Sequence, residues 1–554
     1  MRLFRSHPNG DIAGGSYDVV VVGGGSAGSL VAGRLAAETD AEVLLLESGG
    51  WDLNPLIRIP AGYSKLLARG TFVLDYSTVP QAQLDGRPGP FTQGHGIGGG
   101  SSINAMAYVR GQRRDYDRWN TAAGGDGGWS YDDLLPYFRA MEANSIFADE
   151  YHGTEGPLKV SWPREVNPLN LAAIQAFQEV GLPFNADYNG ADQGGVSVLQ
   201  LTLGDARRCS SADAFLHPAR KRPNLTIRTH ALVERLLLDG SRITGARFVH
   251  RRRRQDALAP HVIVCAGAFN SPRLLMLSGI GPEDELSRHQ IPVKVTSPDV
   301  GHHLQDHPNV GLHARAGRAD AGYAKDARGI PMLIDGLRYL LTHDGPAATN
   351  GIPSVAYCNP DRPDEPPTVQ IFHTPIGSGL GQGPPVPGLT LETIVLQPQS
   401  RGRVTLKDAD PRSVPLIDPN WLSEPDDMTT MLAGLRYGRR VLQTQALKNL
   451  VEPASTPGFA TDTDEGLAEY ARNNVWTNYH CVGTCRMGAD DESVVDPALK
   501  VRGVNGLRVI DASVMPNLPS GNTNAPTMAI ASKGLELLKA DLQANTPRAR
   551  NLRR

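Results

Sequence analysis

The sequence predicts an α/β protein built around a Rossmann-like parallel sheet. Three observations carry this prediction. Residues 19–22 are four valines that lead into glycines spaced G-x-G-x-x-G, at Gly23, Gly25 and Gly28. Apolar residues then recur at helical spacing, and a second apolar run over residues 43–46 ends in Glu47. A third, largely apolar run covers residues 261–265, as expected of a strand buried on both faces of a parallel sheet.

Each part of the first unit has a physical role in binding a dinucleotide. Gly23 permits the tight turn after the strand, Gly25 lets a pyrophosphate approach the backbone, and Gly28 lets the helix pack closely on the strand. Glu47 stands 19 positions after Gly28, where an acid can accept hydrogen bonds from the adenosine ribose. The unit predicts a dinucleotide site and fits NAD and FAD equally well.

The same turn fits one alternative. Residues 24–28 also match G-x-S-x-G, the nucleophile elbow of α/β-hydrolases, which would make Ser26 a nucleophile. Such an elbow normally follows several strands, and this interpretation leaves Glu47 without a role. In the dinucleotide interpretation, Ser26 and Ala27 lie at the helix start, whose free N–H groups favour phosphate.

Charge and cysteine content exclude other classes. The 55 Lys and Arg residues are balanced by 58 Asp and Glu, which argues against a protein that coats nucleic acid. Five cysteines provide no disulfide framework, and Cys481 and Cys485 beside His480 lack a second ligand pair, so we expect no metal site. The chain shows no signal-peptide core and no run approaching ~18 apolar residues. We therefore expect a cytoplasmic protein without a transmembrane segment.

A second glycine cluster lies between residues 94 and 100, where five of seven residues are glycine. It is followed by Ser102, Asn104, Met106 and Ala107. A segment that presses its backbone against a flat ring or a diphosphate needs this composition. We therefore expect the cluster to contact the same ligand as the N-terminal fingerprint.

Further helices are predicted from capping residues. After the run at residues 261–265, Ser271 is a suitable N-cap with Pro272 at the first helical position, and the helix should end before Gly279. A strand over residues 507–510 and a final helix after Pro526 close the predicted core. Eight prolines between residues 360 and 387 predict an irregular loop stretch, which is either a lid or plain surface.

Several of these blocks resemble one enzyme family. Residues 94–117 are similar to the first signature of the glucose–methanol–choline (GMC) oxidoreductases, and residues 267–281 resemble the second. The resemblance extends to residues 300–308 and to the C-terminal third of the chain. It implies FAD as the cofactor. Some members tether the flavin through a histidine at the position that Ile103 occupies here, so we expect FAD to be bound non-covalently.

The resemblance also implies a division of the chain. A discontinuous substrate-binding domain, built on an antiparallel sheet with helices, should accompany the Rossmann-like FAD-binding domain. The expected FAD-binding segments are residues 17–160, 201–310 and 476–545; the substrate-binding segments are 161–200 and 311–475; and residues 1–16 and 546–554 are expected to be flexible ends.

The family's catalytic histidine matches His480, and the second member of its catalytic pair matches Asn522. Alcohol oxidation sends a hydride from the carbinol carbon to flavin N5 and a proton from the oxygen, and an imidazole is a suitable acceptor for that proton. The Asn522 amide can donate a hydrogen bond to the substrate oxygen but cannot act as a base. Trp476 and Tyr479 are expected to line the substrate pocket. Further expected flavin contacts are Gly98, Gly99, Ser102, Asn104, Met106, Ala107, Val233, Asp511, Ala512, Asn522 and Thr523.

The predicted function is FAD-dependent oxidation of a primary alcohol, aromatic or allylic, to the aldehyde. A choline-type alcohol dehydrogenase, a hydroxynitrile lyase on the same fold and a hydrolase that uses Ser26 remain alternatives. The electron acceptor, either O2 or a quinone or other carrier, and the oligomeric state are left open by the sequence.

Overall fold

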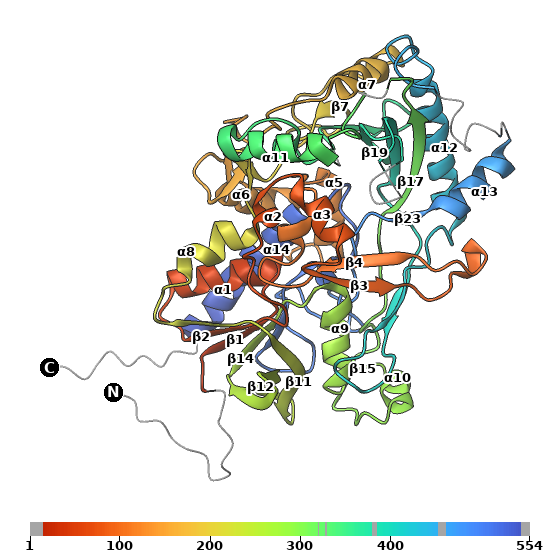
Figure 1. The fold of residues 1–554 in the computed structure, drawn as a ribbon. Coiled ribbons are helices and arrows are strands. Elements are labelled where there is room, and N and C mark those ends of the chain that lie inside the picture. Colours follow the sequence, from red (N-terminus) through yellow and green to blue (C-terminus); the bar gives the residue numbers. More distant parts are fainter. Residues whose placement is uncertain are drawn as a thin grey trace.

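The structure, a computed structural model, describes residues 15–318, 321–326, 329–378, 385–452, 461 and 463–544 (Figure 1). The expected flexible ends, residues 1–16 and 546–554, lie outside the described residues except for Gly15 and Ser16. Helices and strands alternate along the chain, which confirms the predicted α/β class.

A five-stranded sheet, with every pair parallel, forms the lower part of the molecule in Figure 1. Its order is β10 (Leu225–Arg228), β2 (Val43–Leu46), β1 (Val19–Val22), β14 (His261–Val264) and β24 (Leu507–Val509). The predicted strands thus form the centre and one edge of the sheet. Strand β10 at the other edge alternates apolar and polar residues. It therefore lacks the continuous apolar run from which the other strands are predicted.

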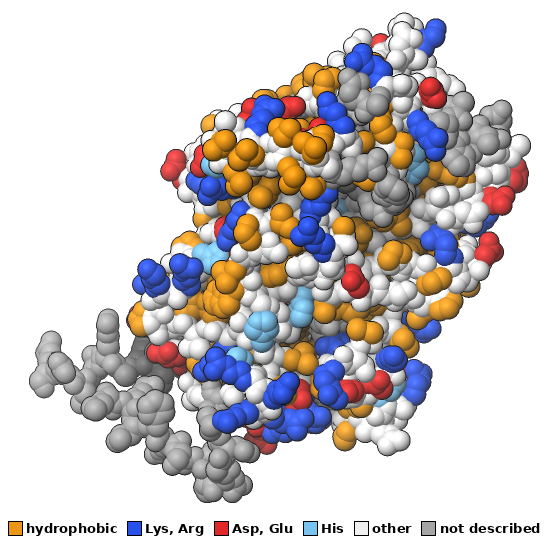
Figure 2. Space-filling model, viewed as in Figure 1, with side chains coloured by type: hydrophobic (Ala, Val, Ile, Leu, Met, Phe, Trp, Pro, Cys, Tyr) orange, Lys and Arg blue, Asp and Glu red, His pale blue; other side chains and the backbone are white. Residues whose placement is uncertain are grey.

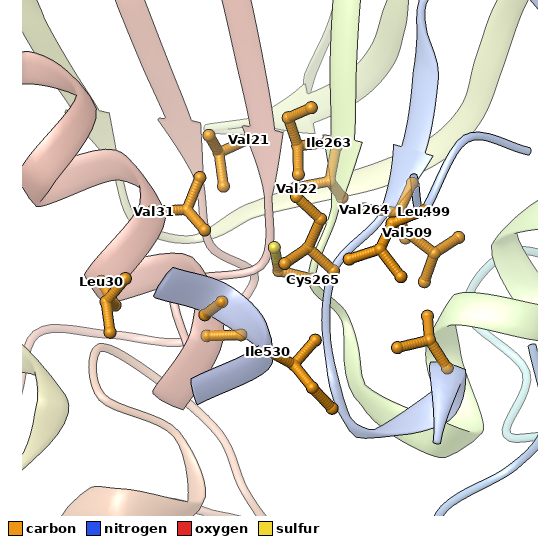
Figure 3. Close-up of a cluster of buried hydrophobic side chains, with 14 of the residues drawn as sticks. Val21, Val22, Leu30, Val31, Ile263, Val264, Cys265, Leu499, Val509 and Ile530 are labelled. Carbon is orange, nitrogen blue, oxygen red and sulfur yellow. The ribbon is translucent and has the colours of Figure 1, made fainter. Parts of the chain in front are cut away.

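Helices α1 (Ser26–Glu38) and α14 (Asn524–Ala544) pack on each other and against this sheet. Figure 3 shows Leu30 of α1 and Ile530 of α14 in the same buried cluster as Val22 and Val264. Burying an aliphatic side chain of this size contributes ~1.5–3 kcal/mol relative to leaving it exposed. This cluster therefore fixes where the loops at the carboxyl ends of β1, β14 and β24 are held.

A six-stranded sheet, antiparallel throughout, forms the upper right of the molecule. Helices α7 (Pro168–Glu179) and α12 (Pro425–Leu442) pack against it. This is the antiparallel sheet with helices that the family resemblance implies. Its strands in order are β23 (Trp476–Thr477), β17 (Pro308–Arg315), β20 (Gly388–Val395), β19 (Val369–Thr374), β18 (Ser354–Cys358) and β7 (Gly195–Val198).

The proline-rich stretch is not the uninterrupted loop that its composition predicts. Strand β19 lies within it, buried along its length and paired with both β18 and β20. The prolines lie on either side of this strand, where they take no donor away from the sheet ladder. Residues 379–384 of the stretch lie outside the described residues.

The remaining elements lie outside these two sheets. The third sheet comprises β11 (Ala231–Asp239), β12 (Arg242–His250) and β13 (Arg253–Leu258). The other helices are α2 (Pro55–Arg58), α3 (Gly62–Ala68), η1 (Ala82–Leu84), α4 (Gly100–Ile103), α5 (Arg113–Ala122), α6 (Tyr131–Met141), η2 (Ala212–Leu216), α8 (His217–Ala219), α9 (Gly267–Leu277), α10 (Glu283–Arg288), α11 (Gly329–Thr342), η3 (Pro346–Ala348), α13 (Asp464–Asn474) and η6 (Ala512–Val514). The other strands are β3 (Val73–Ser77), β4 (Pro90–Gly94), β5 (Glu142–Asn144), β6 (Leu158–Val160), β8 (Leu203–Gly204), β9 (Arg207–Arg208), β15 (Ile280–Gly281), β16 (Val295–Thr296), β21 (Arg403–Thr405) and β22 (Leu416–Asp418).

Helix α9 corrects the predicted cap at Ser271. The helix begins at Gly267, five residues before Pro272, so Pro272 lies inside it and not at its first position. Pro272 has no N–H to donate to the carbonyl of Ala268, and the hydroxyl of Thr484 donates to that carbonyl instead, at 2.6 Å. The predicted end is confirmed, because the last helical residue, Leu277, precedes Gly279.

Candidate active site

One cavity of about 1280 Å³ lies where the carboxyl ends of the parallel strands meet the six-stranded sheet. The turn after β1 and the end of β2 supply part of its wall, including Gly25 and Glu47. Trp476 of β23 and His480, just beyond that strand, supply another part. Residues that are hundreds of positions apart in the sequence therefore face one space.

Most of the predicted site residues line this cavity. They are Gly23, Gly25, Ser26, Ala27, Glu47, Gly99, Asn104, Ala107, Val233, Trp476, Tyr479, His480, Asp511, Ala512, Asn522 and Thr523. The structure does not place Gly28, Gly98, Ser102 or Met106 in the lining. Gly28 packs α1 against β1, the Ser102 hydroxyl donates to the carbonyl of Ile97, and Met106 is buried in a separate apolar cluster.

The glycines of the wall divide into two kinds. A Cβ on Gly23 would collide with the carbonyl of Cys265, and a Cβ on Gly28 with the carbonyl of Gly23, so these two glycines allow close packing. A Cβ on Gly100 or Gly267 would meet no atom within 4 Å, and one on Gly25 only the Cα of Gly99 at 3.9 Å. The latter three glycines leave room along the wall for a ligand that approaches the backbone, as a diphosphate requires.

Two buried carboxylates fix the loops of this wall. Glu47 accepts the backbone N–H groups of Gly24 and Gly49, each at 2.7 Å, and so ties the turn after β1 to the end of β2. Asp511 accepts the N–H of Gly267 at 2.8 Å and the Ser271 hydroxyl at 2.6 Å. Both carboxylates also face the cavity, where the remaining lone pairs of their oxygens can accept hydrogen bonds from a ligand.

His480 and Asn522, which line the same cavity, come into contact. Nε2 of His480 lies 3.0 Å from Nδ2 of Asn522, although 42 residues separate them. The backbone N–H of His480 donates to Asp306 at 2.8 Å, which anchors the residue independently of its ring. The structure thus brings together the two residues that the sequence indicates as a catalytic pair.

The orientation of the Asn522 amide follows from its other neighbour. Nε2 of Gln370, on β19, lies 3.3 Å from Oδ1 of Asn522 and 3.0 Å from the hydroxyl of Tyr357. Because Gln370 donates to the oxygen, Asn522 directs its NH2 group toward His480 and the cavity. The pair therefore presents a hydrogen-bond donor beside an imidazole nitrogen.

Burial sets the protonation of this site. It lowers the pKa of His480 well below the usual 6.5, and neighbouring His307 lowers it further. Burial also lowers the pKa of His307 to about 4 and raises the pKa of Asp306 to about 7. At neutral pH both imidazoles are uncharged, so His480 is able to accept a proton.

Aromatic side chains and one carboxylate surround the space next to this pair. Tyr63, Phe372, Trp476 and Tyr479 line the cavity, and the rings of Trp476 and Tyr479 meet edge to face with centroids 6.0 Å apart. Glu392 of β20 also lines it and accepts the amide of Asn309 at 2.6 Å. Burial, and next the charge of Glu392, raise the pKa of Tyr479 to about 12, so its hydroxyl keeps its proton.

The sequence gives no role to Gln370, Glu392, Tyr63 or His307, yet all four touch this site. Gln370 and Glu392 are large polar residues on the buried strands β19 and β20, which is a signal that a strand face contacts something other than the core. His307 stands within residues 300–308, the block that resembles the family. Tyr63, in the short helix α3, carries no local signal.

All five cysteines are free and buried, including Cys481 and Cys485 beside the site. Among the described residues, no helix is both long and apolar enough to cross a membrane.

A glycine-lined wall that shares one cavity with an uncharged histidine fits an oxidoreductase that binds a dinucleotide. Comparisons with known proteins give the family. Models of the N- and C-terminal parts of the GMC oxidoreductases match residues 17–309 and 398–531. The chain belongs to the GMC oxidoreductase family and is an FAD-dependent alcohol oxidoreductase.

Individual relatives agree over nearly the full length. The alcohol dehydrogenase (acceptor) of Pseudomonas putida is 40% identical over 533 residues, which cover 94% of this chain and 95% of the relative. The oxygen-dependent choline dehydrogenase of Brucella anthropi is 35% identical and covers 96% of this chain and 97% of its own length. Pyridoxine 4-oxidase from Mesorbium loti has a similar solved structure, with a TM-score of 0.84, 33% identity and coverage of 94% and 99%.

Family membership decides two of the questions that the sequence leaves open. GMC oxidoreductases bind FAD, and the open glycine-lined wall with Glu47 fits such a cofactor. The hydrolase interpretation of Ser26 is wrong, because the family to which the chain belongs consists of oxidoreductases.

Proposed function

We propose that the protein oxidises a primary alcohol, aromatic or allylic, to the aldehyde, with His480 as the base. One observation carries the proposal: the uncharged His480 ring and the donor amide of Asn522 lie side by side, 3.0 Å apart, on the cavity wall. A hydroxyl that enters between them meets an acceptor for its proton and a donor for its oxygen.

Bound FAD would supply the acceptor for the hydride that leaves the carbinol carbon. Gly23, Gly25, Ser26, Ala27 and Glu47 would hold its ADP half. Gly99, Asn104, Ala107, Asp511, Ala512 and Thr523 would hold the flavin half, and Val233 a part of the cofactor between these groups. Hydrogen bonds to Glu47 and Asp511 hold the loops of this wall, and Gly25, Gly100 and Gly267 leave room for the cofactor.

The chain's own residues would handle the proton. Nε2 of His480 takes the proton from the substrate hydroxyl, and Nδ2 of Asn522 donates to the oxygen as negative charge develops there. The low pKa of His480 keeps the ring unprotonated before the reaction. His480 is buried, and the low polarity of its surroundings strengthens the hydrogen bonds at its ring.

The apolar and aromatic lining supports an aromatic or allylic substrate. Phe372 and Ile352 line the cavity together with Tyr479 and Trp476, and a flat unsaturated group can pack on such rings. A carbinol carbon next to an unsaturated group also loses a hydride more readily, because the developing positive charge is delocalised.

A choline-type substrate is the second candidate, and Glu392 is the observation that favours it. Recognition of a quaternary ammonium needs aromatic faces and benefits from a carboxylate. Tyr63, Trp476 and Tyr479 offer the aromatic faces, and Glu392 offers a buried carboxylate in the same cavity. Replacing Glu392 with Gln would weaken turnover of a cationic alcohol and leave a neutral aromatic alcohol nearly unaffected.

We further propose that FAD is bound non-covalently, since Ile103 offers no nucleophile where some family members carry the tethering histidine. Denatured protein should release all of its flavin into the supernatant, and yellow colour on the pellet would contradict this. The domain division proposed from the sequence places residues 17–160, 201–310 and 476–545 around FAD and residues 161–200 and 311–475 around the substrate.

The decisive experiment is a panel of alcohols tested for bleaching of the flavin and for formation of aldehyde. Aromatic, allylic, saturated and cationic primary alcohols should be compared, with peroxide release and quinone reduction measured in parallel. Fastest bleaching by the aromatic or allylic alcohols supports the proposal. Faster bleaching by the cationic alcohol selects the second candidate, and cyanohydrin cleavage without bleaching would indicate a lyase.

A further inference from the structure

A chain of hydrogen bonds leads from a backbone carbonyl to the proposed base. Nε2 of His307 lies 3.0 Å from the carbonyl oxygen of Leu396, and Nδ1 of His307 lies 2.8 Å from Nδ1 of His480. His307 is fully buried at the entry to β17, and its ring is nearly perpendicular to that of His480, at 87°. No step of the proposed function uses His307.

The hydrogen-bonding roles along this chain are fixed at its buried end. A carbonyl oxygen can only accept, so Nε2 of His307 carries a hydrogen. A neutral imidazole has one N–H, which leaves Nδ1 of His307 as an acceptor. The hydrogen between the two rings therefore belongs to Nδ1 of His480, and Nε2 of His480 keeps its lone pair on the side of Asn522 and the cavity.

We propose that His307 is a positioning residue that holds His480 in the tautomer whose Nε2 can accept a proton from the substrate. This inference rests on the proposed role of His480 as base. A lone imidazole exchanges between its two tautomers, and only one of them presents a lone pair to the substrate. A neutral acceptor behind Nδ1 selects that form without placing a charge next to the base.

The surroundings keep His307 uncharged. Its pKa is lowered to about 4 by burial, although the carbonyl groups of Leu396 and Pro519 oppose the shift. The carboxyl of Asp306 is nearby, but its oxygens accept the backbone N–H of His480 and the indole N–H of Trp421. Nδ2 of Asn478 lies 3.2 Å from Nδ1 of His480, and this tautomer requires the Asn478 amide to turn so that its oxygen faces the same hydrogen.

The arrangement also serves the reaction once the proton has moved. His480 then carries hydrogens on both nitrogens, and the bond from its Nδ1 to His307 remains. The ring keeps its orientation because its Nδ1 partner does not change. His307 supplies the lone pair for this bond but does not raise the pKa of His480, which burial and His307 both lower.

An isosteric pair of variants tests this inference. In His307→Asn, the amide oxygen takes the place of Nδ1 and still accepts from His480, whereas His307→Leu has the same shape without an acceptor. We expect the rate constant for flavin reduction to fall roughly 10²-fold in His307→Leu, because part of the general-base contribution of ~10²–10⁴ is lost. His307→Asn should stay within about tenfold of the wild type.

A purely structural role predicts the opposite order, because a buried amide is harder to accommodate than a leucine of the same size. The tautomer itself is read from ¹⁵N-histidine NMR of the FAD-loaded protein, where Nδ1 of His480 should be the protonated nitrogen in the wild type and in His307→Asn. A wild-type rate in His307→Leu, or a protonated Nε2 of His480 in the wild type, would overturn the inference. If His480→Ala reduces the flavin normally, the proposed base itself fails, whatever the His307 variants show.

A separate observation concerns helix α11, whose apolar face points outward. Six of its aliphatic side chains are 59–76% exposed: Ile330, Leu333, Ile334, Leu337, Leu340 and Leu341. Tyr339 on the opposite side is buried against Ala206 and Ala348. Figure 2 shows apolar side chains gathered over this helix. We call these six side chains the α11 face.

We infer that the α11 face docks on a lipid surface. A stable protein interface uses ~20–30 residues a side and centres on aromatic and arginine anchors. The α11 face offers six aliphatic side chains on one helix about 21 Å long, which is too few for a second copy of the chain but typical of a helix lying in a membrane interface.

The charges around the helix indicate which lipid is needed. Near the helix, Glu165, Asp326, Asp335 and Asp344 balance Arg164, Arg207, Lys325 and Arg338, and Arg338 pairs with Asp344 at 2.7 Å. The described residues around the α11 face therefore carry no excess of positive charge. Docking should depend on apolar burial alone and should not require anionic lipid.

Flotation of the full FAD-loaded chain with phosphatidylcholine vesicles tests this. We expect the wild type to float with the vesicles equally well at low and high salt. Leu333→Asp/Leu337→Asp should float at least tenfold less, since each change exposes a charge to the acyl region. Leu53→Asp/Leu171→Asp, which charges two exposed leucines outside α11, should float like the wild type.

The lipid proposal is overturned if the wild type stays unbound, or if both double variants bind equally. It is also overturned if the α11 variant halves the molar mass measured by light scattering, because a second copy would then cover this face.

Discussion

The two walls of the cavity are built in different ways. On the side of the parallel sheet, backbone and glycine form the surface, and carboxylates such as Glu47 and Asp511 hold the loops. On the side of the antiparallel sheet, functional side chains on separate segments meet, as His480, Asn522 and Gln370 do. The first wall depends on the absence of side chains and the second on their exact identity, so the two should respond differently to substitution.

The largest expected effect is on the side-chain wall, in His480→Ala. This variant should bind FAD normally, because the glycine wall is untouched, but its rate of flavin reduction by alcohol should fall ~10²–10⁴-fold with the loss of the base. Anaerobic stopped-flow mixing measures this rate. His302 lies outside the cavity lining, so His302→Ala serves as the control. Bleaching at the wild-type rate would remove His480 from the mechanism.

Asn522→Ala should lower the rate constant of flavin reduction by a smaller factor, on the order of 10²–10³. This is the loss expected when one donor to a developing oxyanion is removed. The variant leaves Nε2 of His480 unprotonated, so the base still works. Asn420→Ala controls for the loss of an amide elsewhere. A loss as large as that of His480→Ala would mean that Asn522 has more than a donor role.

A third variant tests the backbone wall. The side chain of Gly25→Val would extend into open space where we expect the diphosphate, so the dissociation constant of FAD should rise at least tenfold, or ~1.4 kcal/mol. Because Gly25 has φ near −72°, the backbone accepts a side chain, and the melting temperature of the FAD-free protein should be unchanged. Fluorescence titration with FAD measures the affinity. Normal FAD binding would show that the diphosphate lies elsewhere.

The smallest expected effect is that of pH on the rate of flavin reduction in the wild type. The base must be unprotonated, and the pKa of His480 lies well below 6.5, so the rate of flavin reduction should stay flat from pH 8 to pH 6.5. It should decline only at lower pH, as Nε2 of His480 becomes protonated. A decline already centred on pH 6.5 would mean that the histidine is solvated in the working enzyme.

The contrast between the walls also explains what the sequence could predict. The Gly23–Gly25–Gly28 spacing and Glu47 are local, within one strand–helix–strand unit, so their roles can be read from spacing alone. His480 and Asn522 were found through resemblance. Neither spacing nor resemblance predicts roles for Gln370 and Glu392, because a polar residue on a strand acquires its partner only when the sheet forms. The start of α9 was mispredicted since Thr484, from a distant segment, satisfies the carbonyl that Pro272 leaves unpaired.

The central claim is that this cavity removes a hydride and a proton from an alcohol. Anaerobic mixing of the FAD-loaded wild type with a primary aromatic alcohol tests it directly, with either hydrogen or deuterium on the carbinol carbon. The flavin should bleach, one aldehyde should form per flavin, and deuterium should slow the bleaching. An oxidised flavin that remains yellow with every alcohol of the panel would contradict the claim.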